Sequence, residues 1–333
     1  MNNNMQKHAL KIICYIFCSI YINANSQNAN ISSFTIKTNY KTTFNAGFND
    51  TIGKYGSNDF GISFIIPVYK HLFVNKENKS GFYNLSLLNS NNLIFSKIDF
   101  LDKNNTLLNL NLGIKGVYFS GNKNLWLSKI TLNFFEDEYS ISAPHPKFSG
   151  TFIFDRIVNR NFSYHLGLTY RYSFGIASFL PVAGLKYGIT DRWKLLLSLP
   201  FYSCIQYKVN KQLQLSTKIR PTGTLSYYTN KSKLFGQSQE ILLFRKRANT
   251  FSLDALYKLN SSISILGEVG REANRKIYFS NLRTEINKEP INYFMSRINS
   301  TWFINFGFAF KLGKTKSTAN DYTIDYFEDD FDF

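Results

Sequence analysis

Cysteine is nearly absent from this sequence, and its shortage excludes a disulfide framework. Three cysteines occur among 333 residues, and two of them, Cys14 and Cys18, lie in an apolar N-terminal stretch. Beyond that stretch Cys204 stands alone. A lone cysteine forms no disulfide within its own chain, so stability has to come from a packed core or from the closure of a sheet.

Histidine is also scarce, and the sequence lacks the spacing patterns of metal sites and common catalytic centres. His71, His145 and His165 have no second histidine or cysteine at zinc-ligand spacing. We find no phosphate-binding glycine loop and no nucleophile elbow. The acidic run at residues 136–138 lacks the spaced oxygen ligands of a calcium loop, and we interpret it as a solvated acidic tip. We therefore predict no enzyme, no metal, no cofactor and no catalytic residue.

No uninterrupted apolar run is long enough to cross a bilayer as a helix. The run at residues 12–22 has eleven residues, whereas a spanning helix needs about 20. Two lysines precede it and a stretch of small residues follows it, which is the pattern of a secretory signal cleaved near Ser26. We predict a signal peptide at residues 1–26 and an exported chain that starts at Gln27.

Aromatic and basic residues are abundant. The sequence contains 32 Phe and 21 Tyr but only seven Pro, a composition typical of strands and turns. The formal charge of +17 becomes +15 without Lys7 and Lys11 of the predicted signal. The basic residues are scattered along the predicted strands, and export makes nucleic acid an improbable partner. Anionic lipid headgroups or small anionic solutes fit this charge better.

Apolar and polar residues alternate along several stretches, as they do on strands with one apolar face. The pattern is clear in residues 108–118, 164–174 and 302–312. Their apolar faces run for about 10 residues, the length that a tilted strand needs to cross a bilayer, and they end in aromatic residues. The opposite faces carry Gly, Ser, Asn, Thr and single charges, which suit a wet lumen. We predict an all-β, single-domain, antiparallel transmembrane β-barrel over residues 27–313, with a secreted β-sandwich as the alternative fold.

The number of strands should be even, because both ends of a bacterial barrel normally lie in the periplasm. We predict about 12 strands, with 10 or 14 as alternatives. They are selected from fifteen stretches, at residues 33–43, 58–68, 81–88, 92–100, 106–119, 124–135, 149–158, 162–174, 178–189, 193–207, 212–228, 239–246, 250–259, 262–270 and 301–312.

The connections between these stretches differ in length. Residues 187–193 and 257–263 contain very short ones, which we predict to be periplasmic turns. Four polar segments are longer, and we predict them to be outer loops or irregular connections: residues 74–80, 135–147, 229–239 and 271–297.

The alternation stops after Gly313, and residues 314–333 form a tail. Residues 321–333 contain six acidic side chains among thirteen, together with five aromatic ones. Acidic groups at this density repel one another and cannot be buried unpaired, so we predict a disordered extension. In the alternative interpretation Tyr322, Phe327, Phe331 and Phe333 dock on a partner or plug a basic lumen.

The chain resembles the uncharacterised outer-membrane β-barrel proteins of Bacteroidota. The resemblance is clearest over residues 162–228, in particular at residues 180–187 and at Asp191-Arg192-Trp193, and it returns at residues 307–310. It implies a barrel in the outer membrane of a Gram-negative bacterium. The partners that follow are outer-membrane lipid, lipopolysaccharide and the barrel assembly machinery, and the resemblance implies no activity.

The charge on the polar faces carries the functional prediction. We predict six basic lumen-lining residues, Lys115, Arg171, Lys186, Lys194, Lys258 and Lys311. Lys37 and Lys129 share this placement, and the pattern sets only Asp254 and Glu268 against them. A basic lumen attracts anions. The first hypothesis is a passive conduit for small anionic solutes.

Two alternatives to a conduit remain. In one, the charges pair locally or with the tail, and the protein is a non-conducting envelope or surface barrel whose outer loops bind partners. In the other, an outer-membrane lipid-modifying enzyme uses His165 with Ser163 on the same face. That pair would still need a third group to orient it and an oxyanion site.

Overall fold

The described part of the chain is built entirely of antiparallel strands. The computed structural model describes residues 34–49, 53–75, 77–98, 105–137, 146–173, 176–229, 241–281 and 292–312. The strands are β1 (Phe34–Gly47), β2 (Lys54–Val74), β3 (Ser80–Ile98), β4 (Asn105–Phe119), β5 (Asn124–Asp137), β6 (Lys147–Asn159), β7 (Phe162–Ser173), β8 (Ile176–Gly188), β9 (Trp193–Leu199), β10 (Tyr202–Lys208), β11 (Leu213–Thr229), β12 (Ile241–Lys258), β13 (Ile263–Ser280), β14 (Asn292–Ile298) and β15 (Thr301–Leu312). Over these ranges no helix has the length and apolar character needed to cross a membrane.

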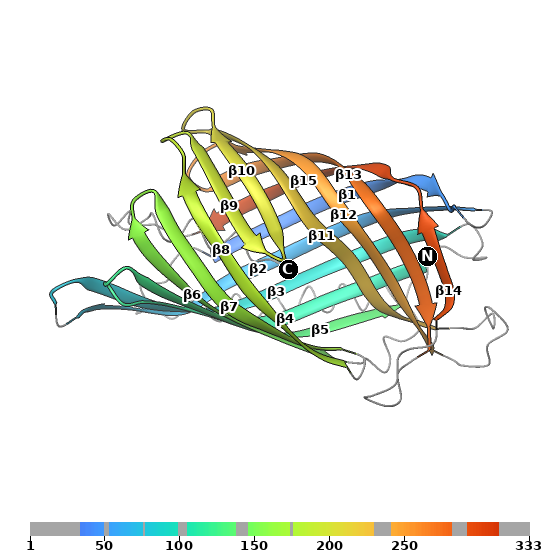
Figure 1. Ribbon diagram of the computed structural model, residues 1–333, viewed down its shortest axis with the longest axis horizontal. Helices are drawn as coiled ribbons and strands as arrows, with labels where there is room; N and C mark the ends of the chain where they lie inside the picture. Colours follow the sequence, from blue (N-terminus) through green and yellow to red (C-terminus); the bar gives the residue numbers. More distant parts are fainter. Residues whose placement is uncertain are drawn as a thin grey trace.

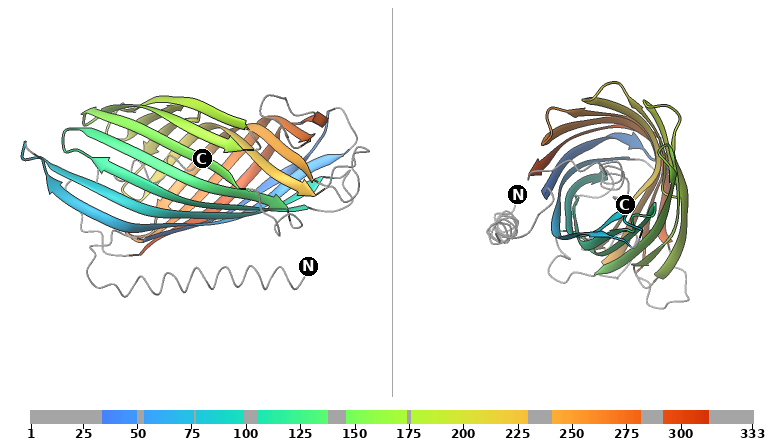
Figure 2. Two further views of the ribbon diagram at one scale, coloured as in Figure 1. Left: turned by 90° about the horizontal axis from the view of Figure 1, so that it is seen from below. Right: turned by 90° about the vertical axis from the view of Figure 1, so that its left-hand side faces the viewer.

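The strands form one sheet that closes into a barrel (Figures 1 and 2). From β1 to β14 each strand pairs with the next one along the chain, and β1 pairs with β15. Both β14 and β15 pair with β13, end to end, so they form one interrupted strand. The prediction of a closed antiparallel β-barrel is therefore confirmed, with 14 strands around the ring. This number is the upper of the predicted alternatives and exceeds the preferred count of about 12.

The connections differ between the two ends of the barrel. At one end, here called the turn end, no connection exceeds five residues. The turn end comprises residues 75–79, 120–123, 160–161, 189–192, 209–212 and 259–262. The opposite end, here called the loop end, holds the connections at residues 48–53, 99–104, 138–146, 174–175, 230–240 and 281–291, whereas residues 200–201 join the short strands β9 and β10.

Three of the predicted loops need correction. Residues 74–80 contain the hairpin turn between β2 and β3, which lies at the turn end and not among the outer loops. Residues 271–297 are mostly strand, since β13 continues to Ser280 and β14 begins at Asn292. Residues 135–137 are the last residues of β5. These strands extend beyond the apolar alternation that identified them, because their ends are held by cross-strand pairing rather than by an apolar face.

Several predicted strand boundaries also differ from the structure. The polar residues 89–92 split one stretch of the sequence, but they pair with β2 and β4 within the continuous strand β3. Likewise β12 joins two predicted stretches through Arg247 and Asn249. Conversely, residues 193–207 are two strands, β9 and β10, that turn at Pro200 and Phe201, where the Phe201 amide donates to the Ser198 carbonyl at 2.7 Å.

The short β9–β10 hairpin leaves two strand edges without a partner. Within the described residues, nothing pairs with β8 before Ala183 on its β9 side or with β11 after Ile219 on its β10 side. Pro181 and Pro221 lie in these unpaired stretches. Proline has no N–H to donate and is tolerated at strand edges. The hairpin ends near the middle of the barrel in Figure 1.

Alternation sorts side chains between the two faces of the wall. Large aliphatic and aromatic side chains are exposed on the outer face, among them Leu166, Leu168, Ile304 and Trp302. Their strand neighbours on the inner face, such as His165 and Phe303, are buried. Over residues 164–171 of the predicted stretch 164–174, the apolar-out, polar-in orientation is the one in the structure.

An apolar core fills the loop end of the barrel. It is made of twelve buried side chains, Ala46, Phe48, Tyr55, Ile94, Ile98, Leu107, Tyr228, Leu242, Phe244, Ile277, Phe279 and Ile298. We call it the outer core. The ring of Phe279 packs edge-on against Tyr228 with centroids 5.4 Å apart and lies 5.3 Å from Phe244. Such packing excludes water from this end of the lumen.

A contact between β5 and β11 narrows the loop end further, although five strands separate them in the sheet. The Asp137 carboxylate accepts a hydrogen bond from the Thr229 hydroxyl at 3.0 Å. Lys147 Nζ, from the start of β6, donates to the Leu225 carbonyl at 3.0 Å and lies over the rings of Phe135 and Tyr227. We call this contact the clasp. It closes a narrower ring of β11 to β14 and β1 to β5.

The clasp gives a prediction for local stability. Lys147→Met keeps the apolar stem but removes the charged donor to the Leu225 carbonyl, a bond of the type that contributes about 1.5–3 kcal/mol. Amide hydrogen exchange near the end of β11 is expected to accelerate at least tenfold. Lys123→Met is the matched control, because Lys123 donates to the Val158 carbonyl at the same 3.0 Å but is exposed in a turn. Equal exchange in the two variants would contradict a structural role for the clasp.

Candidate functional site

Two lysines face each other across neighbouring strands on the inner wall. Lys115 of β4 lies directly opposite Lys129 of β5, and both are half-buried. They alternate with the inward side chains Leu107, Asn109 and Leu127. Like charges directly opposite each other destabilise an antiparallel pair. An anion that lies between the two ammonium groups would offset this repulsion.

Hydroxyl groups surround the two lysines. The same cross-strand row continues through Thr151 and Thr169, whose hydroxyls are 3.2 Å apart. The next row holds Thr131 and Ser149, which share a hydrogen bond. Ser149 lies directly opposite Arg171. Hydroxyls both donate and accept, so the inner faces of β4 to β7 offer donors beside the cations for an anionic ligand.

Three other predicted lumen residues lie on the same wall, Arg171 on the loop-end side of the lysine row, and Lys186 and Lys194 near the turn end. Arg171 is half-buried, with its guanidinium 5.7 Å from the centre of the Phe201 ring. Lys186 is 7% exposed and lies near Asp155. Lys194 is half-buried at the start of β9.

The last two predicted residues lie at the rim. Lys311 is half-buried one residue before the end of β15, and Lys258 is exposed at the end of β12. All six predicted residues thus occupy inward positions of the alternation, and four of them line the wall from β4 to β9. Their action on solutes stays a prediction.

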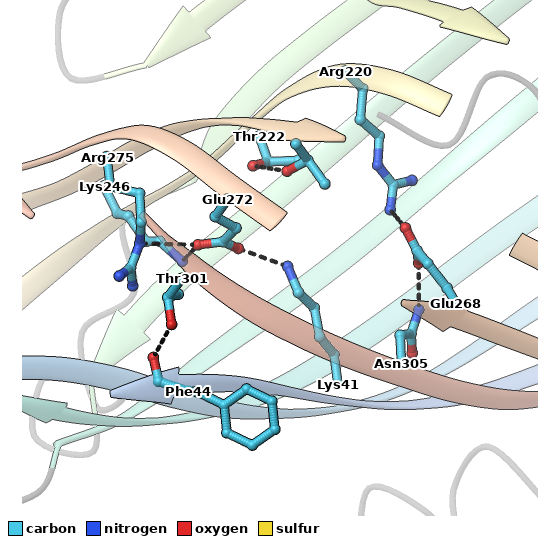
Figure 3. A network of polar contacts seen from close by, with 11 residues as sticks. Lys41, Phe44, Arg220, Thr222, Lys246, Glu268, Glu272, Arg275, Thr301 and Asn305 are labelled. Atoms are coloured by element: carbon cyan, nitrogen blue, oxygen red, sulfur yellow. Dashed lines mark hydrogen bonds and ion pairs between the residues drawn. The ribbon is translucent and has the colours of Figure 1, made fainter. Parts of the chain in front are cut away.

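The opposite wall carries a network of ion pairs (Figure 3). Glu272 of β13 is 1% exposed and contacts three cations. Lys41 Nζ donates to its Oε1 at 2.8 Å, Lys246 Nζ lies 2.8 Å from its Oε2, and Arg275 Nε lies 3.3 Å from the same oxygen. Arg275 is itself buried and donates to the Asn299 carbonyl at 3.2 Å.

A β-bulge creates this network. Two residues three apart on a regular strand point to opposite faces, so Glu272 and Arg275 should not meet. Between them the register of β13 against β12 shifts, and Asn274 adopts a positive φ of 51°. The extra residue turns Arg275 to the inner face beside Glu272. No alternation pattern in the sequence could indicate this contact.

A second set of pairs lies nearer the turn end. Asp254 and Glu268 are directly opposite each other on β12 and β13. Lys218 Nζ lies 2.9 Å from Asp254, and Arg220 Nη2 lies 2.8 Å from Glu268. Asn305 also donates to Glu268 at 2.9 Å. Cations on β11 therefore offset the repulsion between the two carboxylates.

The inner faces carry more carboxylates than the sequence pattern indicated. Asp59, Asp155 and Glu272 join Asp254 and Glu268. Most of these acids lie on the wall from β11 to β2, where cations pair with them. The excess of positive charge is thus concentrated on the wall from β4 to β9, which we call the basic wall.

His165 has a structural partner that the sequence did not suggest. Its Nε2 lies 3.2 Å from the Ser198 hydroxyl of β9, not beside Ser163. Ser163 instead donates to Asp155 at 3.5 Å. Ser198 is fully buried, so its hydroxyl has no access to a substrate. The contact between His165 and Ser198 links strand β7 to strand β9, and it does not present the accessible nucleophile that a hydrolase needs.

The interpretation of residues 136–138 as a solvated acidic tip also needs correction. Glu136 and Asp137 are 1% and 3% exposed, so they are not a solvated tip, because β5 continues to Asp137 and lies against β11. Residue 138 and His145 lie outside the described residues. Within the described part, no three His, Cys, Asp or Glu side chains gather as a metal site would require.

A shallow groove of about 620 Å³ lies on the outer face. Its floor is the directly paired Ala255 and Gly267, and exposed apolar side chains such as Trp193, Leu253 and Phe306 form its walls. It faces away from the basic wall.

Comparisons with solved structures found channels and porins. An outer membrane channel from Pseudomonas putida F1 has 9% sequence identity and a TM-score of 0.41, over 86% of this chain and 97% of that one. A mutant of the TodX monoaromatic hydrocarbon channel has 9% identity and a TM-score of 0.38, over 86% and 91%. The KdgM porin has 10% identity and a TM-score of 0.32, over 83% and 99%.

The sequence itself matches one family. No curated protein matches it. Residues 102–311, which extend from just before β4 to the end of β15, match the model of a family described as a domain of unknown function. Because this match covers more than half of the chain, the protein belongs to the family named Domain of unknown function (DUF6268).

Proposed function

We propose that this protein is an outer-membrane β-barrel whose lumen takes up small anionic solutes. The membrane location is supported by the closed ring of strands and by the exposed aliphatic and aromatic side chains on its outer face. The turn end would face the periplasm, as short connections do in such barrels. The assignment to Bacteroidota and the cleaved signal at residues 1–26, which lies outside the described residues, remain predictions.

The observation that carries the solute class is the pair formed by Lys115 and Lys129. Two directly opposed lysines, with Arg171 and a row of hydroxyls beside them, make an electrostatic site for a carboxylate, phosphate or sulfate. The site lies on a wall that no membrane lipid reaches. A small anion that enters from the turn end would meet Lys194 and Lys186 before it.

A second candidate function is a non-conducting barrel, which the outer core favours. Twelve packed apolar side chains at the loop end leave an axial path only if they move. In that case the protein would bind anions from the periplasmic side or present its outer loops to partners. A lipid-modifying enzyme is disfavoured because Ser198, the hydroxyl that contacts His165, is fully buried.

Reversal potentials in planar bilayers test the proposal. The full-length mature protein is expected to give steps with anion preference, and replacing both Lys115 and Lys129 by glutamine is expected to lower the anion-to-cation permeability ratio severalfold. Lys276→Gln is the matched control, because Lys276 follows the bulge on the outer face.

Each outcome separates the alternatives. An unchanged permeability ratio in the double variant would refute the lysine site. A folded barrel, shown by heat-modifiable migration on a gel, that carries no current would favour the non-conducting barrel. A protein that never enters the bilayer would overturn the membrane location.

A further inference from the structure

We propose that the basic wall binds the chain's own acidic aromatic segment, residues 321–333, which thereby occupies the anion site from within. This inference rests on the basic lumen of the proposed function and adds its regulation. The occupant is one segment of this chain, and it competes with solute for the same cations. Four observations carry the proposal: the starting point of the segment, its reach, its charge and its aromatic side chains.

The segment starts at the correct end of the barrel. β15 ends at Leu312, and the neighbouring Lys311 amide donates to the Ser262 carbonyl in a turn-end connection at 2.7 Å. The described chain therefore ends at the turn end, where the lumen is not filled by the outer core.

The linker is long enough to reach the basic wall. Eight residues separate Leu312 from Asp321, and an extended chain covers about 3.4 Å per residue, so Asp321 can lie up to about 30 Å from Leu312. Lys194 and Lys186 lie within three residues of the turn end. Lys129 is five residues into β5, about 17 Å along the strand. The cations nearest the turn end are thus within reach of the linker, and the segment itself extends further along the wall.

The charges of the two partners are complementary. The segment carries six carboxylates, and the basic wall carries Lys115, Lys129, Arg171, Lys186 and Lys194. Of the wall's own carboxylates, Asp155 lies beside Lys186, and Asp137 binds Thr229 on β11. Carboxylates between opposed lysines remove the like-charge repulsion, and the lysines in turn relieve the repulsion within the acidic segment.

The aromatic side chains of the segment match an apolar patch beside the cations. Leu125, Leu127, Ile153, Val182 and Phe201 form a buried cluster on the inner faces of β5 to β8 and at the tip of the β9–β10 hairpin. Leu127 lies two residues from Lys129, and Arg171 lies over the Phe201 ring. The cluster itself is buried, and the partly buried Val117, Phe119, Leu180 and Tyr202 at its edge are the groups that aromatic rings can pack against. An acidic and aromatic peptide uses both this edge and the cations, whereas inorganic anions use only the cations.

Disulfide cross-linking of the full chain in isolated outer membranes tests this proposal. In a Cys204→Ala background, Phe331→Cys is combined with Thr151→Cys on the inner face or with Phe152→Cys on the outer face. Thr151 is half-buried beside Lys129, and Phe152 is 51% exposed. We expect cross-links with the substitution at Thr151 and none with the substitution at Phe152. Thr169→Cys, on the same row, replaces Thr151→Cys if that variant fails to fold.

The charge dependence is tested in the same assay. Replacing Asp325, Glu328, Asp329 and Asp330 by their amides is expected to lower the yield about tenfold, the size of effect expected when several ion pairs are lost. Raising the salt concentration should act in the same direction. Equal yields at the two faces, or a yield that ignores the acidic residues, would overturn the proposal.

Failure of this inference is distinguishable from failure of the proposed function. Cross-linking does not require conduction. Specific cross-links in a barrel that carries no current would therefore support binding of the segment and contradict the conduit. Anion-selective current without inner-face cross-links would support the conduit and contradict binding of the segment. If both hold, the amide variants should also show longer open times than the parent.

Discussion

Glu272→Gln is expected to lower the free energy of unfolding by about 3–5 kcal/mol, the cost of removing one partner from a buried ionic group. Lys41, Lys246 and Arg275 all lie within 3.3 Å of its carboxylate, and the side chain is 1% exposed. The amide cannot balance three cations held together on one wall. Chemical unfolding of the barrel in lipid vesicles measures the change.

Glu77→Gln is the matched control for this effect. Glu77 also contacts a lysine, with its Oε2 2.6 Å from Lys79 Nζ, but both side chains are more than half exposed. Water screens such a pair, so the control should unfold with the parent. If Glu272→Gln were as stable as the control, the network would contribute little and the three cations would have to be balanced by other groups.

Gly184→Ala is expected to destabilise the barrel by about 1–3 kcal/mol, the usual cost of overpacking. A Cβ at Gly184 would overlap the Leu197 carbonyl oxygen of β9 and the ring of His165. The carbonyl belongs to the short hairpin, which has few other contacts to hold it, so the β8–β9 pairing should loosen first. Unfolding in vesicles and amide exchange in β9 measure the two effects.

Gly267→Ala is the matched control, and we expect it not to destabilise the barrel. A Cβ at Gly267 meets nothing within 4 Å, so the substitution should be neutral or should stabilise by up to about 1 kcal/mol through the unfolded chain. Equal destabilisation by the two alanines would mean that the close approach at Gly184 is not what limits the pairing of β8 and β9.

The inward placement of the basic residues could be predicted because it depends on local sequence alone. Side chains on a strand alternate with a period of two, so Lys115 or Arg171 between apolar neighbours has to point inward once those neighbours face lipid. The opposition of Lys115 and Lys129 could not be predicted in this way. It depends on the register between β4 and β5, which the turn at residues 120–123 fixes.

The partners of His165 and Glu272 show where local patterns fail. Ser198 is 33 residues from His165. The two meet because both lie directly opposite Gly184 of the intervening strand β8, and glycine has no side chain to separate them. Glu272 was missed because the predicted strand stopped at residue 270, where the bulge soon interrupts the alternation. Bulges and long-range pairings leave no periodic signal in a single sequence.

The sequence by itself determined the strand character, the two faces of each strand and the excess of basic side chains on the inner one, since all three follow from alternation along the chain. Only the tertiary structure decided the ring of 14 strands, the short β9–β10 hairpin, the clasp and the outer core. These features depend on contacts between residues far apart in sequence. They arise when the barrel closes, because closure determines which inner faces meet across the lumen.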